Sequence, residues 1–261
     1  MYQQATEPRS IGDVLDASFK LYAAAFSHAM PLSAAIAVLG CMPSLIPLLT
    51  AGALTDPLAI IAVLFSPAFL LGLLLALLAS LACYIALLVQ IEAVAQRRSV
   101  GIGAALNTGL RRLLPVFVST IVWGFIIVLG TLLLVLPGLI VMVSMVFAMP
   151  AIVLDDKGAL ESLGYSHRLV WGAWWHAATL VSVMGIPLLI VLLGPSLVIG
   201  ILAMIVAPSP TVLLIAELAL TVVASTLLAP YMLAVMLETY RDLKLRKEGT
   251  AAARLAQAHG A

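Results

Sequence analysis

The sequence predicts an all-α protein that crosses a membrane six times. Hydrophobic residues make up 64% of its 261 residues, charged residues make up 10%, and the mean hydropathy is +1.19. Soluble domains are about half apolar and about a quarter charged. Several apolar runs also exceed the ~20 residues that a helix needs to cross a bilayer. The formal net charge of +1 gives no support to nucleic acid as a partner.

Six apolar segments are the expected spans, and proline interrupts five of them. Proline within a helix frees backbone carbonyl groups that neighbouring helices must satisfy. The fifth span is so long that we expect its tail to fold back or tilt. The predicted spans cover residues 29–50, 58–92, 116–135, 139–154, 176–207 and 211–237, with a hairpin turn at Leu136-Pro137-Gly138 and breaks at Pro43, Pro47, Pro67, Pro150, Pro187, Pro195 and Pro230.

An interfacial amphipathic helix is predicted before each of three span pairs, so the spans form three hairpins. In these stretches apolar residues recur at spacings of three and four, and polar residues take the other face. Such helices lie in the membrane interface rather than cross it. They cover residues 10–26, 102–117 and 159–174. We expect one integral membrane domain over residues 1–261 with a cytoplasmic helical tail from 238 to 261.

The basic residues predict the orientation of the chain. With six spans, all 13 Lys and Arg residues fall on one side of the membrane. By the positive-inside rule, both termini are then cytoplasmic. Membrane lipids are the expected partners, and the cations predicted to meet their headgroups are Lys20, Arg97, Arg98, Arg111, Arg112 and Arg168. Trp174 and Trp175 are expected to anchor the chain at the same interface.

The three units suggest an internal repeat. Residues 11–26 align with residues 102–117 and again with residues 159–174, which places Lys20 on Arg111 and on Arg168. The repeats would cover about 10–95, 101–154 and 159–237. Their parallel orientation differs from the inverted repeats of many secondary transporters. Similar amphipathic pressure on three surface helices could also produce this match.

One stretch has a family resemblance. The segments PGLIVMVSMVFAMPAIVLDDKG and SLGYSHRLVWGAWW resemble bacterial inner-membrane proteins of unassigned activity, namely the YciC-like (UPF0259) and DUF975 proteins and the membrane domain of some glycerophosphodiester phosphodiesterases. The motif and interface residues of interest are Pro137, Gly138, Pro150, Asp155, Ser166, Arg168, Gly172, Trp174 and Trp175. The resemblance implies a multi-pass protein of the bacterial inner membrane. Where relatives often have arginines, this chain has Val141-Met142-Val143 and Tyr165, and no stretch could form a phosphodiesterase domain.

Three polar residues near or within spans are candidate functional residues. Glu217 lies inside the sixth span, while Gln90 and Glu92 lie near the end of the second. An ionisable residue inside a span is a functional hypothesis by default. The alternative is structural, with Glu217 protonated and hydrogen-bonded in the bundle. Glu92 is expected to reach headgroups or a basic partner.

The sequence contains none of the catalytic or metal motifs that we sought, so no cofactor, metal or enzymatic activity is expected. The leading function is a non-enzymatic inner-membrane protein in envelope or lipid organisation, or one that serves an unidentified membrane protein partner. The alternative is a transporter of an apolar or amphipathic solute, with a cavity lined by proline-broken helices and Glu217.

Overall fold

A computed structural model describes residues 2–44, 57–206 and 209–259, and the structure in these ranges is almost entirely helical. Six helical segments are long and apolar enough to cross a membrane. This confirms the predicted all-α, multi-pass class. The helices are α1 (Ile11–Gly40), α3 (Pro57–Leu64), α4 (Pro67–Ala95), α5 (Ile102–Leu133), α6 (Val135–Met145), α7 (Ala148–Leu154), α8 (Ala159–Val170), α9 (Trp174–Val206) and α10 (Pro210–His259), with a 3₁₀ turn at Met42–Ser44.

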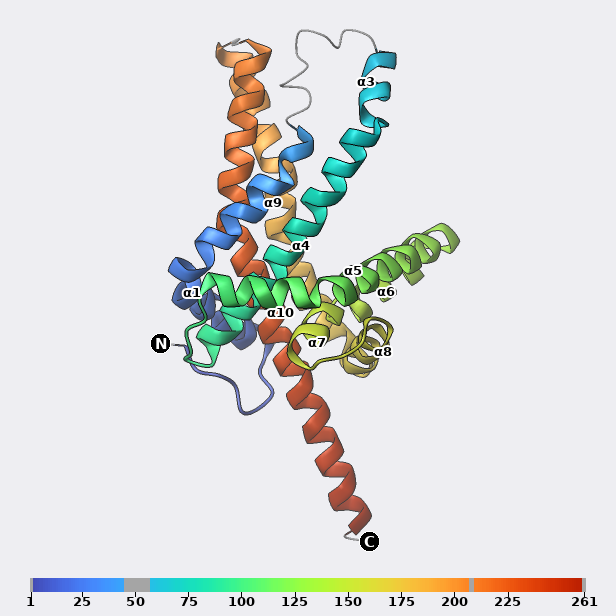
Figure 1. Ribbon diagram of the computed structural model, residues 1–261. Coiled ribbons are helices and arrows are strands. Elements are labelled where there is room, and N and C mark those ends of the chain that lie inside the picture. The colour runs from blue at the N-terminus through green and yellow to red at the C-terminus, as the bar shows by residue number, and fades with distance from the viewer. Residues whose placement is uncertain (1, 45–56, 207–208, 260–261) are drawn as a thin grey trace.

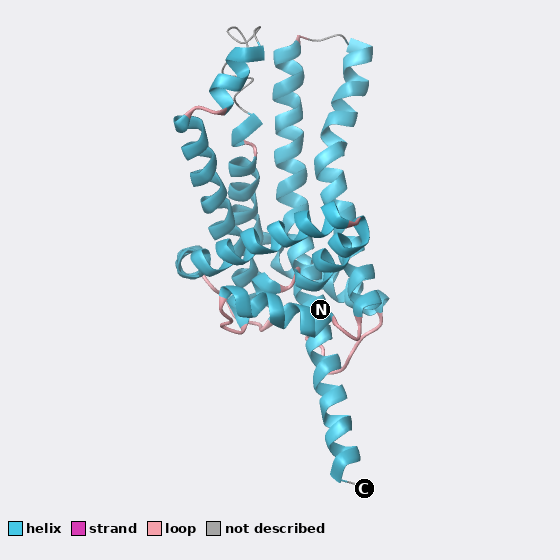
Figure 2. Ribbon diagram, turned by 90° about the vertical axis from the view of Figure 1, so that its right-hand side faces the viewer, coloured by secondary structure: helices cyan, strands magenta, loops and turns pink. Residues whose placement is uncertain are grey.

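Helices α1, α4, α9 and α10 form an upright bundle, and α7 and α8 lie at one end of it, whereas α3 lies at the other (Figure 1). Figure 2 shows the bundle from the side. We call this the basic end, because Arg9, Arg112, Arg241 and Lys244 form ion pairs there. At the opposite end α9 finishes and α10 begins. The C-terminal part of α10 projects beyond the basic end (Figure 1).

Two of the three predicted interfacial helices are continuous with the spans that follow them. Residues 10–26 belong to α1 and residues 102–117 to α5, and each helix continues through an internal proline, Pro31 or Pro115. The prediction of separate helices was wrong there, because no residue in a left-handed conformation ends the amphipathic stretch. Only α8 is separate. Gly172, with a φ of +100°, interrupts the helical conformation between α8 and α9.

The prolines interrupt the helices less than expected. Helix α9 runs unbroken through Pro187 and Pro195, so the predicted fold-back of its tail was wrong. Helix α10 is likewise continuous through Pro230. Pro230 cannot donate to the Thr226 carbonyl, and the buried Ser33 hydroxyl of α1 donates to that carbonyl instead, at 2.6 Å. A neighbouring helix thus satisfies the group that the proline frees.

Pro67 and Pro150 do mark helix boundaries. Pro67 begins α4 after the short helix α3, as predicted. The predicted fourth span is divided into α6 and α7 at Val146 and Phe147. Val146 lies four residues before Pro150, where the proline ring conflicts with the preceding carbonyl group. The break therefore precedes the proline by one helical turn.

The turn between α5 and α6 lies earlier than predicted. Leu134 alone is extended, with φ −164° and ψ 145°, and Pro137 and Gly138 already belong to the first turns of α6. The prediction of a Leu136-Pro137-Gly138 turn was wrong, because proline fits the first turn of a helix as well as it fits a loop. A Cβ added at Gly130 would lie 3.1 Å from the Cα of Gly138. The two glycines let α5 and α6 approach closely.

The α5–α6 hairpin leans away from the bundle, and its tip ends well short of the opposite end (Figure 1). Helix α6 has 11 residues, which span only ~16 Å at ~1.5 Å per residue, and the segment is long enough to cross a membrane only when α7 is counted with it. A hydrocarbon core is ~30 Å thick. We therefore expect the tip to remain inside the bilayer.

Cysteine labelling tests the position of this tip. With Cys41 and Cys83 replaced by serine, Leu134→Cys should resist a membrane-impermeant maleimide from both sides. Thr211→Cys, exposed at the start of α10, serves as the control and should react from one side. Labelling of Leu134→Cys at the rate of Thr211→Cys would show that the hairpin crosses the membrane completely.

The first part of the predicted tail belongs to the core. Tyr240 and Leu243 are fully buried together with Leu21, Leu87 and Leu88 of α1 and α4. Treating residues 238–261 as a separate extension was therefore wrong for the first turns after 238. These turns alternate apolar and charged residues, and both kinds find partners inside the bundle. The internal repeat stays a prediction.

Candidate functional site

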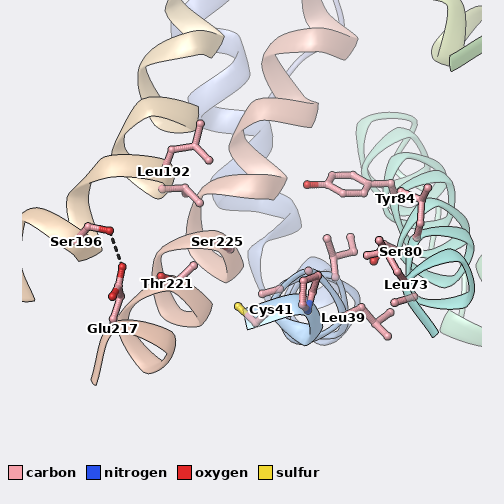
Figure 3. A pocket seen from close by; sticks show the side chains of 17 residues that line it. Leu39, Cys41, Leu73, Ser80, Tyr84, Leu192, Ser196, Glu217, Thr221 and Ser225 are labelled. Atoms are coloured by element: carbon pink, nitrogen blue, oxygen red, sulfur yellow. Dashed lines mark hydrogen bonds between the residues drawn. The ribbon is translucent and has the colours of Figure 1, made fainter. Parts of the chain in front are cut away.

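A cavity of about 470 Å³ lies between α1, α4, α9 and α10, on the side of the opposite end (Figure 3). Its wall is mainly apolar, with Ile36, Leu73, Leu77 and Leu192 among the lining residues. Ligand sites in proteins usually have volumes of about 300–1,000 Å³ and combine apolar walls with a few polar groups. The polar residues of this wall are Ser80, Tyr84, Ser196, Glu217, Thr221 and Ser225.

Helical spacing brings these polar groups onto the cavity wall. Glu217, Thr221 and Ser225 follow one another at intervals of four along α10, so they share one face of that helix. Ser80 and Tyr84 repeat the spacing on α4 across the cavity. The Tyr84 hydroxyl points across the cavity toward α10 (Figure 3). Two polar stripes therefore face one space inside an apolar bundle.

Glu217 forms one hydrogen bond there. The Ser196 hydroxyl of α9 donates to its carboxylate at 2.5 Å (Figure 3). No ion pair involves Glu217 within the part of the chain that the structure describes. Residues 29–96 and 177–240 contain no Lys, Arg or His at all. The segments that form the cavity thus offer the carboxylate no basic partner.

A second group of polar residues lies at the basic end. There the Arg241 guanidinium connects α10 to α4 and to the N-terminal segment. Arg241 contacts Glu92 Oε2 through Nη2 at 2.6 Å and Glu238 Oε1 through Nη1 at 2.9 Å. The Tyr2 hydroxyl donates to Glu238 at 2.6 Å, and Arg9 also pairs with Glu238 at 3.3 Å. Burial raises the pKa of the Tyr2 phenol, so this group stays protonated as a donor.

Two further acids complete what we call the ion-pair layer. Asp242 accepts from Arg246 Nε at 2.7 Å and contacts His176 Nε2 at 2.9 Å. Asp155 pairs with Lys244 at 2.9 Å and accepts from the Tyr240 hydroxyl at 2.5 Å. The layer comprises the acids Glu92, Asp155, Glu238 and Asp242 with the bases Arg9, His176, Arg241, Lys244 and Arg246. The carboxylates of Glu238 and Asp242 are each 2% exposed, and they tolerate this burial because each one has a basic partner.

The other two polar residues predicted in the spans, Glu92 and Gln90, each have a partner in the structure. Glu92 meets a basic partner, as expected, and the partner is Arg241. Gln90 is buried, with its amide nitrogen 3.5 Å from the Val100 carbonyl oxygen. Its Oε1 atom has no hydrogen-bond partner among the described residues. Neither residue lines the cavity that contains Glu217.

The motif residues have structural positions. The buried Ser166 hydroxyl donates to the Ser144 carbonyl at 2.8 Å and accepts from the Phe147 amide at 3.2 Å, which satisfies backbone groups at the α6–α7 break. Asp155 belongs to the ion-pair layer and Gly172 ends α8. Trp174 is half-buried, whereas Trp175 is 80% exposed.

The predicted headgroup cations are mostly free to meet lipid. Arg112 is half-buried and pairs with Asp156, while Lys20 pairs with Asp16 at 2.5 Å. The side chains classed as exposed are Lys20, Arg97, Arg98, Arg111 and Arg168. Their contact with headgroups stays a prediction. No cluster of three or more metal-ligating side chains occurs in the described ranges.

Comparison with known proteins gives one match. The profile of a family described as Domain of unknown function (DUF7847) matches residues 32–243, which include the cavity and most of the ion-pair layer. The chain belongs to this family. No curated protein and no solved structure matches it. This match does not bear on the resemblance to the YciC-like and DUF975 proteins, which stays a prediction.

Proposed function

We propose that this DUF7847 protein is a non-enzymatic membrane transporter that binds an amphipathic solute in the cavity between α1, α4, α9 and α10. The observation that carries the proposal is the pair of polar stripes facing one apolar cavity within the bundle. Polar side chains in membrane-spanning helices are expensive, and those that line a cavity mark solute or ion pathways. The cavity thus favours the second of the two functions that the sequence suggested.

The ion-pair layer supports the same proposal. Arg241 and its partners lie at the basic end, where Leu237, Tyr240 and Leu243 fill the core around them. The cavity lies on the other side of this packed region. A solute site with a closed layer on one side is what alternating access requires of one of its two states. We place both termini on the cytoplasmic side, since the basic end carries the cations, and we take the bacterial inner membrane from the resemblance to the YciC-like and DUF975 proteins.

Photolabelling tests the binding site. The probe is dodecanol with a photoreactive diazirine in its alkyl chain, added to the purified protein in a neutral maltoside detergent. We expect mass spectrometry to map the label to peptides of α9 and α10 that line the cavity. Thr221→Phe places a bulky ring in the cavity and should reduce that labelling at least tenfold.

The matched control is Val223→Phe, on the same helix but 55% exposed and outside the cavity wall. It should label like the wild-type protein. Equal labelling of the cavity peptides in wild type and in Thr221→Phe would remove the basis for the transporter proposal.

A second candidate, organisation of lipid by the protein surface, is supported by the exposed cations and tryptophans. Arg97, Arg98, Arg111 and Arg168 are exposed, and so are Trp171 and Trp175. Interfacial aromatic rings and cations are typical of surfaces that meet headgroups. Under this function the cavity is incidental, so Thr221→Phe would leave the protein's effect on anionic bilayers unchanged.

A further inference from the structure

We infer that the solute is a cationic amphipath, a molecule with one positive charge and an apolar body, and that Glu217 is its counter-charge. The inference rests on the proposed function and names the class of solute that its cavity would take. Three independent features of the cavity lead to it: the absence of basic residues, the nature of the polar groups and the shape of the apolar wall.

The charge balance of the two ends differs. At the basic end every acid of the ion-pair layer has a basic partner. Among the residues that the structure describes, Glu217 has only the Ser196 hydroxyl as a partner, and the cavity-forming segments 29–96 and 177–240 contain no basic residue. An ionised carboxylate in an apolar environment is costly unless a positive charge lies beside it. A cationic solute would supply the positive charge that these segments lack.

The polar groups around Glu217 suit a cation. The oxygens of Ser196, Thr221 and Ser225 can accept hydrogen bonds from a protonated amine or face a quaternary ammonium with their partial negative charge, and the ionised carboxylate only accepts. The Tyr84 ring also lines the cavity, and aromatic faces attract cations. An anionic headgroup would instead meet an unpaired carboxylate. The site therefore selects by charge against anionic phospholipids.

The rest of the wall suits a hydrocarbon body. Leu73, Leu77 and Leu192 project into the space beside the polar stripes, together with Ile36 and Ala37 of α1. These three leucines are 39%, 54% and 61% exposed, so the apolar wall reaches the outer surface of the bundle. An alkyl chain can thus enter from the bilayer while its charged head reaches Glu217.

Competition against the photoreactive dodecanol tests the inference. The competitors are dodecyltrimethylammonium, whose charge is independent of pH, and unlabelled dodecanol. In the wild-type protein the cation should compete at least tenfold better than the alcohol. In Glu217→Gln this ratio should fall to about one, while competition by dodecanol stays within twofold of wild type.

Glu217→Asp keeps the charge and should keep a preference for the cation, and both variants are checked for a monodisperse elution profile and an unchanged melting temperature. If Glu217→Gln does not fold, the loss of preference is sought instead in wild type at a pH low enough to protonate the carboxylate. A ratio near one in the wild-type protein, with Thr221→Phe still blocking the label, overturns the inference and leaves the transporter proposal standing. Labelling that Thr221→Phe does not reduce overturns both.

Discussion

Replacing Arg241 by methionine is expected to lower the free energy of unfolding by about 3–5 kcal/mol, the range for breaking a buried ion pair by removing one partner. The guanidinium is 11% exposed, and its removal leaves Glu92 without its 2.6 Å basic contact. Glu238 keeps Arg9 and Tyr2 but loses its contact at 2.9 Å. Unfolding in mixed detergent micelles, followed by circular dichroism, measures the effect.

The double variant Glu92→Gln/Arg241→Met provides the control for this prediction. It removes the unpaired carboxylate, so it should recover part of the stability that Arg241→Met loses. Glu248→Gln, on the exposed part of the same helix, should change stability by less than about 0.5 kcal/mol. Equal stability of Arg241→Met and wild type would mean that the ion-pair layer does not hold the basic end together.

Replacing Gly109 by alanine is expected to destabilise the fold by about 1–3 kcal/mol, the usual range for overpacking. A Cβ at this position would collide with the Ala82 carbonyl oxygen of α4, and backbone cannot move aside as a flexible side chain can. Helix α5 would have to withdraw from α4, which would also loosen the contacts of the buried Ala105. A lower melting temperature of the purified protein would report this.

Gly103→Ala on the same helix is the matched control. A Cβ there meets no atom within 4 Å, so the only effect is the higher helix propensity of alanine, worth about 0.5–1 kcal/mol of added stability. The two alanine variants should therefore shift the melting temperature in opposite directions. If both shift it upward, the close approach of α4 and α5 at Gly109 is not required.

The sequence was sufficient for the class of the fold and insufficient for the continuity of its helices. Apolar runs longer than a bilayer is thick identify the spans whatever they pack against. Whether an amphipathic stretch continues into a span depends on a few backbone conformations. Helix α8 ends because Trp171 is extended and Gly172 adopts a positive φ. The α6–α7 break depends on Pro150 together with Ser166, which satisfies the freed backbone from 19 residues away in the chain.

The candidate site was predicted in part. Glu217 was recognisable as an ionisable residue in an apolar segment, whereas Thr221 and Ser225 were overlooked, although their spacing of four from Glu217 was visible in the sequence. The partner of Glu92 could not be named, because Arg241 lies 149 residues away in the chain. Pairings of that kind follow from the way helices pack, which local sequence patterns do not record.

The hydrogen bond from Ser33 to the Thr226 carbonyl has a mechanical consequence. It connects α1 to α10 at the point where Pro230 would otherwise weaken α10. We therefore expect these two helices to move as one rigid body. Helix α9 has two prolines, and no side-chain donor in the described part of the chain replaces their missing backbone hydrogen bonds. The softest wall of the cavity is therefore α9. The hydrogen bond from the Ser196 hydroxyl to the Glu217 carboxylate connects this wall to α10.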